Sequence, residues 1–298
     1  MDKSYLFRGA ITELIAPMDA REEIDYALFR QQIQRQLECG IAGLFLSGLT
    51  ECMVTSLDEQ IEMLRVCVAE VKGAVPIMGS ICTNRPRDVL YVMKAYEDIG
   101  ADAVCIANPH TFTYEEGAVY DYFSQLISKA NLPVYIYNAP QTNNILSPAL
   151  VNRLVAENKN VLGYKDSLQN IMHLQEVMLG IDPARHFEVL AGSDASIYAT
   201  LTMGGCGVIS WVSVLFPWLV KELCDAYFAG NVALAREKQF QVSRVRSALK
   251  LAPMDTGYRH VSELLGVSIG QARMPMNPQA TDAQKARVVA RLKELGML

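Results

Sequence analysis

The sequence predicts an α/β fold, a (β/α)8 TIM barrel followed by a C-terminal helical extension. Between residues 9 and 229, short apolar runs rich in β-branched residues alternate with longer segments of helical period. This alternation is typical of parallel strands joined by crossover helices. Eight such units fit a barrel, whose typical length is about 250 residues. Because the strand signals stop after residue 229, we predict a barrel over residues 1–229 and an extension over residues 230–298.

Each predicted element follows from its own local pattern. The first strand alternates apolar and polar residues and stops before Pro17. Several helices open with Ser, Asp or Pro at capping positions. The alternative, a doubly wound open sheet, would carry a GxGxxG turn that is absent here. In order, the predicted strands are Ala10–Ala16, Gly43–Ser47, Val75–Ser80, Ala103–Ala107, Val134–Tyr137, Val161–Lys165, Phe187–Ala191 and Gly207–Ser210. Among the predicted helices are Ile24–Glu38, Leu57–Lys72, Pro86–Ile99, Ser147–Asn158, Val232–Leu251, Tyr258–Leu265 and Asp282–Leu295.

Composition and charge exclude several classes of protein. The net charge of −5 and the absence of a Lys/Arg cluster argue against nucleic-acid binding. No run of 18 apolar residues indicates a membrane span, and the N-terminus lacks the apolar stretch of a secretion signal. The seven cysteines are scattered singly, without a CxxC pair, as reduced core residues would be. We therefore expect a cytoplasmic protein whose partners are neither nucleic acids nor membranes.

Lys165 is the first candidate catalytic residue. Barrel enzymes place their chemistry at the C-terminal ends of the strands, and Lys165 ends the apolar run VLGY. Desolvation in such a pocket lowers the pKa of an ammonium group and yields the free amine that attacks a carbonyl. The alternative is a lysine that has already turned out to solvent.

Tyr137 is the second candidate because it closes the preceding strand of the predicted barrel. Neighbouring parallel strands bring their terminal side chains together, and a phenol can move a proton to or from a carbinolamine. A single tyrosine at a strand end more often serves packing. The pair formed with Lys165 on the adjacent strand favours catalysis.

Other motifs carry less information. The glycine-rich segment Gly204–Ser210 precedes a strand rather than joining a strand to a helix, so it indicates a tight turn more than an anion cradle. The four histidines lack metal-ligand spacing, and neither HExxH nor GxSxG occurs. We therefore predict no metal site and no serine-hydrolase elbow.

The motifs around Tyr137 and Lys165 resemble those of the dihydrodipicolinate synthase and N-acetylneuraminate lyase family of pyruvate-dependent class I aldolases. The resemblance covers nearly the whole chain, and YNxP followed about 25 residues later by GxKD is its most specific part. The matching segments are Gly40–Leu44, Tyr137–Pro140, Gly163–Ser167, Gly192–Asp194, Gly204–Ser210 and Arg273–Pro275.

The resemblance implies a (β/α)8 barrel with a C-terminal helical extension, usually assembled as a homotetramer. It also implies that Lys165 forms a Schiff base, with no other cofactor, and that Tyr137 shuttles protons. Thr50, with backbone N–H groups near Leu49, would hold the pyruvate carboxylate, and Ile209 would line the pocket through its carbonyl. The remaining residues implied to bind substrate are Ser167, Gly192, Ser193 and Asp194.

The chain departs from the family pattern at three places. Where the family has a GTTGE-like loop, this chain reads Gly48 to Cys52, with either a deletion or Glu51 in place of the glycine. Where a second tyrosine is commonly lent across the subunit interface, this chain reads Pro109-His110-Thr111-Phe112, leaving Thr111 as the possible relay substitute. Thr142 replaces an arginine that meets substrate carboxylate in the synthase branch. Because losing a bidentate carboxylate partner is not a conservative change, lysine biosynthesis is disfavoured.

These inferences predict reversible aldol cleavage of a 4-hydroxy-2-keto acid, such as a 2-keto-3-deoxy sugar acid, to pyruvate and an aldehyde. A dehydratase or hydratase-aldolase using the same Schiff base is a close alternative, as is an enzyme like 4-hydroxy-tetrahydrodipicolinate synthase. A non-catalytic ligand-binding barrel is the alternative from another class of protein.

Overall fold

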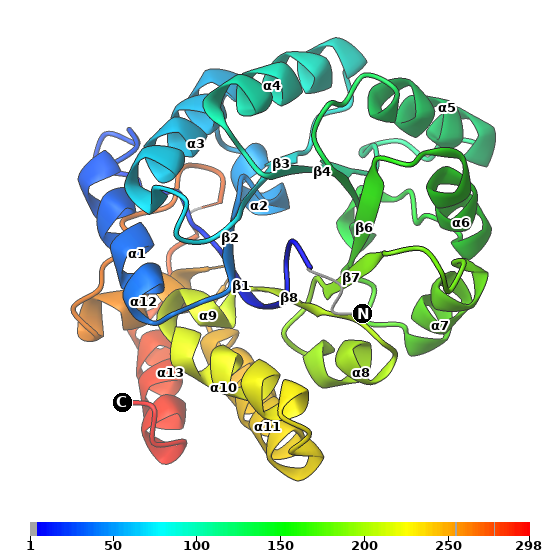
Figure 1. Ribbon diagram of the computed structural model, residues 1–298. Coiled ribbons are helices and arrows are strands. Elements are labelled where there is room, and N and C mark those ends of the chain that lie inside the picture. Colours follow the sequence, from blue (N-terminus) through cyan, green and yellow to red (C-terminus); the bar gives the residue numbers. More distant parts are fainter. Residues whose placement is uncertain (1–4, 254, 277) are drawn as a thin grey trace.

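The computed structural model describes residues 5–253, 255–276 and 278–298. Eight parallel strands close into a barrel in chain order, and the last strand pairs with the first. Helices surround this barrel (Figure 1), so the predicted TIM barrel is confirmed. The strands are β1 (Gly9–Glu13), β2 (Gly43–Leu46), β3 (Ile77–Ile81), β4 (Ala103–Ala107), β5 (Val134–Asn138), β6 (Val161–Asp166), β7 (Glu188–Ala191) and β8 (Gly207–Ser210).

The helices begin and end where local capping dictates. Helix α1 (Tyr26–Glu38) starts later than predicted because the Asp25 side chain accepts the N–H groups of Ala27 and Leu28. Helix α6 (Pro148–Glu157) is capped by Ser147 in the same way. The other helices are α2 (Leu49–Cys52), α3 (Leu57–Val71), α4 (Pro86–Ile99), α5 (Glu116–Ile127), η1 (Pro140–Thr142), α7 (Ile171–Gly180), α8 (Ile197–Thr202), α9 (Val212–Leu215), α10 (Pro217–Phe228), α11 (Val232–Leu249), α12 (Thr256–Leu264) and α13 (Asp282–Glu294).

The first strand is shorter than the sequence predicts. The N–H of Leu14 still donates to the Phe45 carbonyl at 2.9 Å, but the N–H of Ala16 donates to the Glu51 carboxylate at 3.1 Å. The chain therefore leaves the barrel before Ala16. As a result, the residue at the C-terminal end of β1 is Glu13.

The N-terminal end of the barrel is closed by side chains. The buried Glu188 carboxylate accepts the backbone N–H groups of Leu6 and Phe7 and the Tyr135 hydroxyl, at 2.6, 2.9 and 2.6 Å. Gly163 leaves room for the Tyr135 ring, since a Cβ at this glycine would lie 2.3 Å from it. Only the opposite end of the barrel is therefore available for a ligand.

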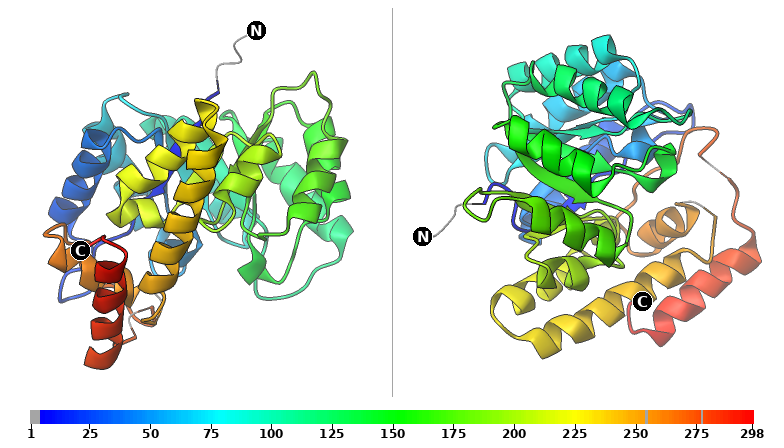
Figure 2. Two further views of the ribbon diagram at one scale, coloured as in Figure 1. Left: turned by 90° about the horizontal axis from the view of Figure 1, so that it is seen from below. Right: turned by 90° about the vertical axis from the view of Figure 1, so that its right-hand side faces the viewer.

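The C-terminal extension packs against one side of the barrel and reaches its open end. Helices α11 and α13 share an apolar cluster with α10, centred on Leu223, Val242 and Leu292. Figure 2 shows the first described residues (dark blue) at one end of the barrel and α12 (orange) at the other. The division at residue 229 stays a prediction. Among the described residues, no helix combines the length and apolar character needed to cross a membrane.

Arg273 fastens the extension to the barrel. Its guanidinium lies 2.7 Å from a Glu59 carboxylate oxygen and donates to the carbonyls of Glu22 and Val54. Val54 follows α2, so this contact holds the loop that the resemblance assigns to the substrate carboxylate.

Candidate active site

Lys165 and Tyr137 lie side by side near the C-terminal ends of β6 and β5. Their backbones pair directly across the two strands. The Lys165 Nζ lies 4.1 Å from the centre of the Tyr137 ring and 3.9 Å from that of Phe45. The Lys165 side chain is only 1% exposed, so it has not turned out to solvent.

Glu13 is the closest charged partner of Lys165, and sequence reasoning missed it. The Glu13 Oε2 accepts a hydrogen bond from Lys165 Nζ at 3.2 Å, although the two residues lie 152 positions apart. Both side chains are buried, at 8% and 1% exposure. The signal in the sequence is an acidic residue inside the apolar first strand, because the predicted strand Ala10–Ala16 runs past Glu13.

The ion pair corrects our expectation about the charge of Lys165. Burial lowers the pKa of this ammonium, but the neighbouring Glu13 carboxylate opposes that effect and the net shift is upward. The predicted lowering of the Lys165 pKa is therefore wrong. The amine is held as an ammonium ion, and a proton must leave it before it can attack a carbonyl.

Tyr137 is placed to donate a proton. Burial raises the pKa of its phenol, and the nearby Lys165 cation offsets part of that rise. The hydroxyl lies 3.4 Å from Ser167 Oγ, and Ser167 also donates to the Gly192 carbonyl at 3.1 Å. The phenol is thus protonated and connected to a second hydroxyl beside it.

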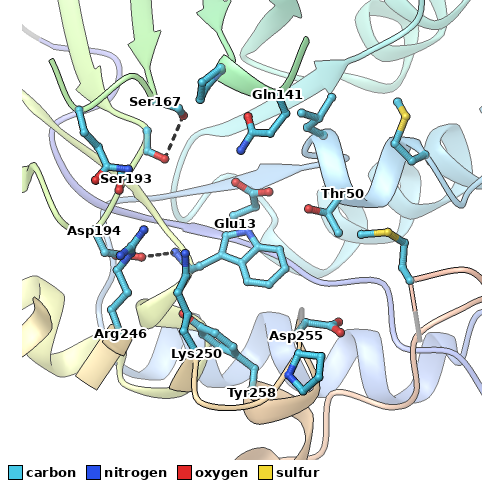
Figure 3. A pocket seen from close by; sticks show the side chains of 18 of the residues that line it. Glu13, Thr50, Gln141, Ser167, Ser193, Asp194, Arg246, Lys250, Asp255 and Tyr258 are labelled. Carbon is cyan, nitrogen blue, oxygen red and sulfur yellow. Dashed lines mark hydrogen bonds between the residues drawn. The ribbon is translucent and has the colours of Figure 1, made fainter. Parts of the chain in front are cut away.

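A cavity of about 770 Å³ opens above these residues. Glu13 and Tyr137 form part of its wall, and Lys165 lies directly behind Glu13. Figure 3 shows Glu13 at the centre, with Thr50 on one side and Arg246 and Lys250 on the other. Of the predicted substrate-binding residues, the cavity wall includes Leu49, Thr50, Ser167, Gly192, Ser193 and Asp194.

The loop Gly48–Cys52, which would hold the substrate carboxylate, is fixed in place by Glu51. Leu49 and Thr50, at the start of α2, face the cavity. The Glu51 side chain is not part of the cavity wall; it is buried and accepts the Ala16 N–H at 3.1 Å. Burial raises the pKa of Glu51 to about 7. Glu51 therefore fixes the loop to the chain that follows β1.

Asp194 lines the cavity but its carboxylate is already occupied. It accepts the Ser210 hydroxyl at 2.5 Å and the N–H groups of Trp211 and Val212 at 3.2 and 3.1 Å. These bonds favour a positioning role over direct contact with substrate. Ser193, in contrast, bears a hydroxyl on the cavity wall.

Arg246 and Lys250, both from the C-terminal extension, were also missed by sequence reasoning. They lie four residues apart at the end of α11 and line the same wall of the cavity. Neither side chain has a hydrogen bond or ion pair within the described part of the chain. From sequence alone the two cations resemble the solvent face of a helix.

Besides Lys165, two predicted site residues, Ile209 and Thr111, are not part of the cavity wall. Ile209 is buried in β8, paired with Ile11 of β1, and its contribution to the pocket through its carbonyl stays a prediction. Thr111 is exposed, with its hydroxyl 3.0 Å from His110 Nδ1, and does not face this cavity. Its role as a relay substitute stays a prediction. Thr142 is buried, and its hydroxyl donates to the Ala139 carbonyl, while Gln141 faces the cavity.

Metal chemistry finds no support in the arrangement of side chains. Within the ranges described, no group of three or more His, Cys, Asp or Glu residues is placed to hold a metal ion.

Comparisons with known proteins agree with this geometry. The model of the dihydrodipicolinate synthetase family matches residues 6–295. A 4-hydroxy-tetrahydrodipicolinate synthase from Brucella suis is 31% identical over 285 residues, covering 94% of this chain and 96% of the relative. The synthase from Nitratidesulfovibrio vulgaris is 30% identical over 276 residues, covering 91% and 93%.

Solved structures give the same result. The dihydrodipicolinate synthase of Thermotoga maritima superposes with a TM-score of 0.92 at 28% identity, covering 99% of this chain and 100% of that one. YagE, a prophage protein of the same family from E. coli K12, solved in complex with pyruvate, gives 0.92 at 26% identity, with the same coverage. Members of the family are lyases that use a pyruvate Schiff base on a lysine and no metal cofactor. This chain belongs to the dihydrodipicolinate synthetase family and is a carbon–carbon lyase of the class I aldolase type.

Proposed function

We propose that the enzyme reversibly cleaves a 4-hydroxy-2-keto acid, such as a 2-keto-3-deoxy sugar acid, to pyruvate and an aldehyde. The observation that carries this proposal is the buried Lys165 beside Tyr137 at the base of a cavity whose wall carries both polar and apolar side chains. That cavity is large enough for a six-carbon acid, since ligand pockets typically measure about 300–1,000 Å³.

In the proposed reaction Lys165 forms an iminium with the keto carbon. The iminium accepts the electrons of the C3–C4 bond as it breaks. Tyr137 moves the proton of the C4 hydroxyl, helped by Thr50 or the substrate carboxylate. Ser167, 3.4 Å from the Tyr137 hydroxyl, would orient the phenol or bind the same substrate oxygen.

The cavity wall supports a hydrophilic substrate tail. Gln141, Gln169 and Ser193 offer amides and a hydroxyl to substrate hydroxyl groups. The unpaired Arg246 and Lys250 favour an anionic group at the far end, such as a second carboxylate or a phosphate. We therefore assign the tail as polyhydroxylated and anionic.

Location and assembly are also proposals. The cysteines are all free, which supports a reducing compartment and hence the cytoplasm. A homotetramer is proposed from the family resemblance, as is the division into a barrel of residues 1–229 and an extension of residues 230–298.

Borohydride trapping tests the proposed mechanism. Incubation with pyruvate and borohydride is expected to add one reduced pyruvyl group at Lys165, located by peptide mass spectrometry. A panel of 2-keto acids with neutral and anionic tails would then be assayed for pyruvate release. Absence of the adduct at Lys165 would contradict the mechanism, and loss of water with retention of the carbon skeleton would indicate a dehydratase.

Formation of 4-hydroxy-tetrahydrodipicolinate is the second candidate function. The names of relatives at about 30% identity favour it. The buried, internally bonded Thr142 argues against it, because the synthase branch is expected to offer an arginine there. Detection of this product at a rate comparable to aldol cleavage would reverse our preference.

A further inference from the structure

The Glu13 carboxylate occupies space that the chain leaves open for it. A Cβ at Gly48 would lie 1.8 Å from Glu13 Oε1 and 2.6 Å from its Cδ. The backbone of Gly48 has φ −59°, a value that any residue adopts, so its conformation does not require glycine. What requires glycine is the room taken up by the carboxylate.

The two oxygens of Glu13 face different surroundings. Oε2 accepts the Lys165 ammonium at 3.2 Å, and Oε1 has no hydrogen-bond donor among the described residues. Glu13 is part of the cavity wall, and Lys165 lies directly behind it. A carbonyl compound that approaches Lys165 from the cavity must therefore pass within contact distance of this carboxylate.

We propose that Glu13 is a catalytic residue, the general base and then the general acid of Schiff-base formation on Lys165. This inference rests on the proposed Schiff-base function and adds a group to it. Glu13 first accepts a proton from the Lys165 ammonium, leaving a neutral amine and a carboxylic acid. The amine adds to the keto carbon, and one proton passes from nitrogen to oxygen, through the Tyr137 hydroxyl, to give the neutral carbinolamine.

The second half of the step restores the charge on Glu13. Its carboxylic acid donates the proton to the carbinolamine hydroxyl, the C–O bond breaks, and water leaves. The products are an iminium cation, a Glu13 carboxylate and one water molecule, so protons and charge balance. Because the cation and the anion disappear together and are formed again together, no unpaired charge is left in the buried site.

If the ion pair between Glu13 and Lys165 were purely structural, Glu13→Gln would change the rate of pyruvate trapping in the opposite direction. If Glu13 only held Lys165 in its ammonium form, Glu13→Gln would release the amine and trapping would become faster or stay unchanged. If Glu13 transfers the protons, the same variant forms the iminium more slowly. General acid–base catalysis contributes about 10²–10⁴-fold, so a slowing of about 100-fold or more is expected.

The experiment measures the rate of pyruvate adduct formation at Lys165 by borohydride quenching at timed intervals. Glu13→Gln is compared with wild type and with Glu237→Gln, a control at an exposed glutamate on α11. Gly48→Ala is the second variant, since it keeps every functional group but displaces the carboxylate. We expect it to slow trapping by about 10-fold or more, and thermal unfolding checks that each variant is folded.

The outcomes separate the two proposals. No adduct in wild type overturns the proposed function itself. An adduct in wild type that forms as fast or faster in folded Glu13→Gln overturns only the role of Glu13. A folded Gly48→Ala variant that traps pyruvate at the wild-type rate would also overturn it.

Discussion

Two parts of the cavity are built in different ways: its floor, formed by Lys165, Tyr137 and Glu13, and its far wall, formed by Arg246 and Lys250. Lys165, Tyr137 and Glu13 stand on strands whose register is fixed by the barrel, and their side chains are almost wholly buried. Arg246 and Lys250 stand at the end of a helix of the C-terminal extension, where Arg246 is half-buried and Lys250 is exposed. In the proposed function the chemistry thus lies on the strands of the barrel, and recognition of the substrate tail lies on a helix outside it.

Removal of the amine is the strongest test of the floor. Lys165→Met is expected to lower kcat by roughly 10³-fold or more, because a nucleophile that forms the covalent intermediate has no substitute. Steady-state assay and borohydride trapping are the measurements, with the exposed Lys159→Met as the matched control. Activity within a few-fold of wild type would remove Lys165 from the mechanism.

The hydroxyl of Tyr137 has the next largest expected effect. Tyr137→Phe keeps the ring that packs on Lys165 but removes the proton donor. We expect kcat/KM to fall by about 10²–10³-fold with little change in thermal stability, and Tyr91→Phe, at an exposed tyrosine, to leave it unchanged. A fall in stability that matches the fall in activity would point to packing instead.

Glu51 lies in the loop beside the cavity floor, and its pKa is also affected by two charges of the C-terminal extension, Arg259 and Asp255. Its pKa is raised by burial from 4.5 to about 7, so the folded chain holds this proton more tightly than the unfolded chain. Between pH 4.5 and 7 the unfolded state loses the proton first, and stability falls as pH rises. Above pH 7 the loss is complete, at up to about 3 kcal/mol.

Glu51→Gln is expected to abolish that dependence, since an amide oxygen can still accept the Ala16 N–H. The free energy of unfolding of the variant, minus that of the wild type, should therefore be larger at pH 8 than at pH 5. Denaturant unfolding at the two pH values measures the difference. An equal difference at both would show that Glu51 titrates normally in the folded protein.

Sequence reasoning found the strand-borne part of the site and missed the rest for physical reasons. Lys165 and Tyr137 were predictable because each ends a local apolar run and adjacent strands are adjacent in space. Glu13 belongs to the same floor, but the alternation of β1 continues past it, and only the bond from Ala16 to Glu51 shows where the strand stops pairing. The length of a strand depends on where its hydrogen bonds to the neighbouring strands end, and the sequence of the strand alone does not show this.

The cationic wall was missed for a different reason. Arg246 and Lys250 recur at helical spacing on an amphipathic segment, where cations normally face solvent. Only the packing of α11 against α10, which fixes the direction of the helix end, brings them to the cavity. The hydrogen-bond partners of Asp194, which are Ser210, Trp211 and Val212, come from the next βα unit and were not predictable from its own segment either.

Neutralising the cationic wall has the smallest expected effect and separates selection from chemistry. Arg246→Gln combined with Lys250→Gln is expected to raise KM for a substrate with an anionic tail by about 10-fold. This corresponds to roughly 1.4 kcal/mol, within the range for hydrogen bonds to charged groups. The values of kcat and the rate of pyruvate trapping should stay unchanged, because neither cation reaches Lys165.

A neutral-tailed substrate and the exposed Arg244→Gln variant are the controls. An equal rise in KM for neutral and anionic tails would mean that Arg246 and Lys250 shape the cavity but do not bind a charged group. The substrate tail would then have to be reassigned as uncharged.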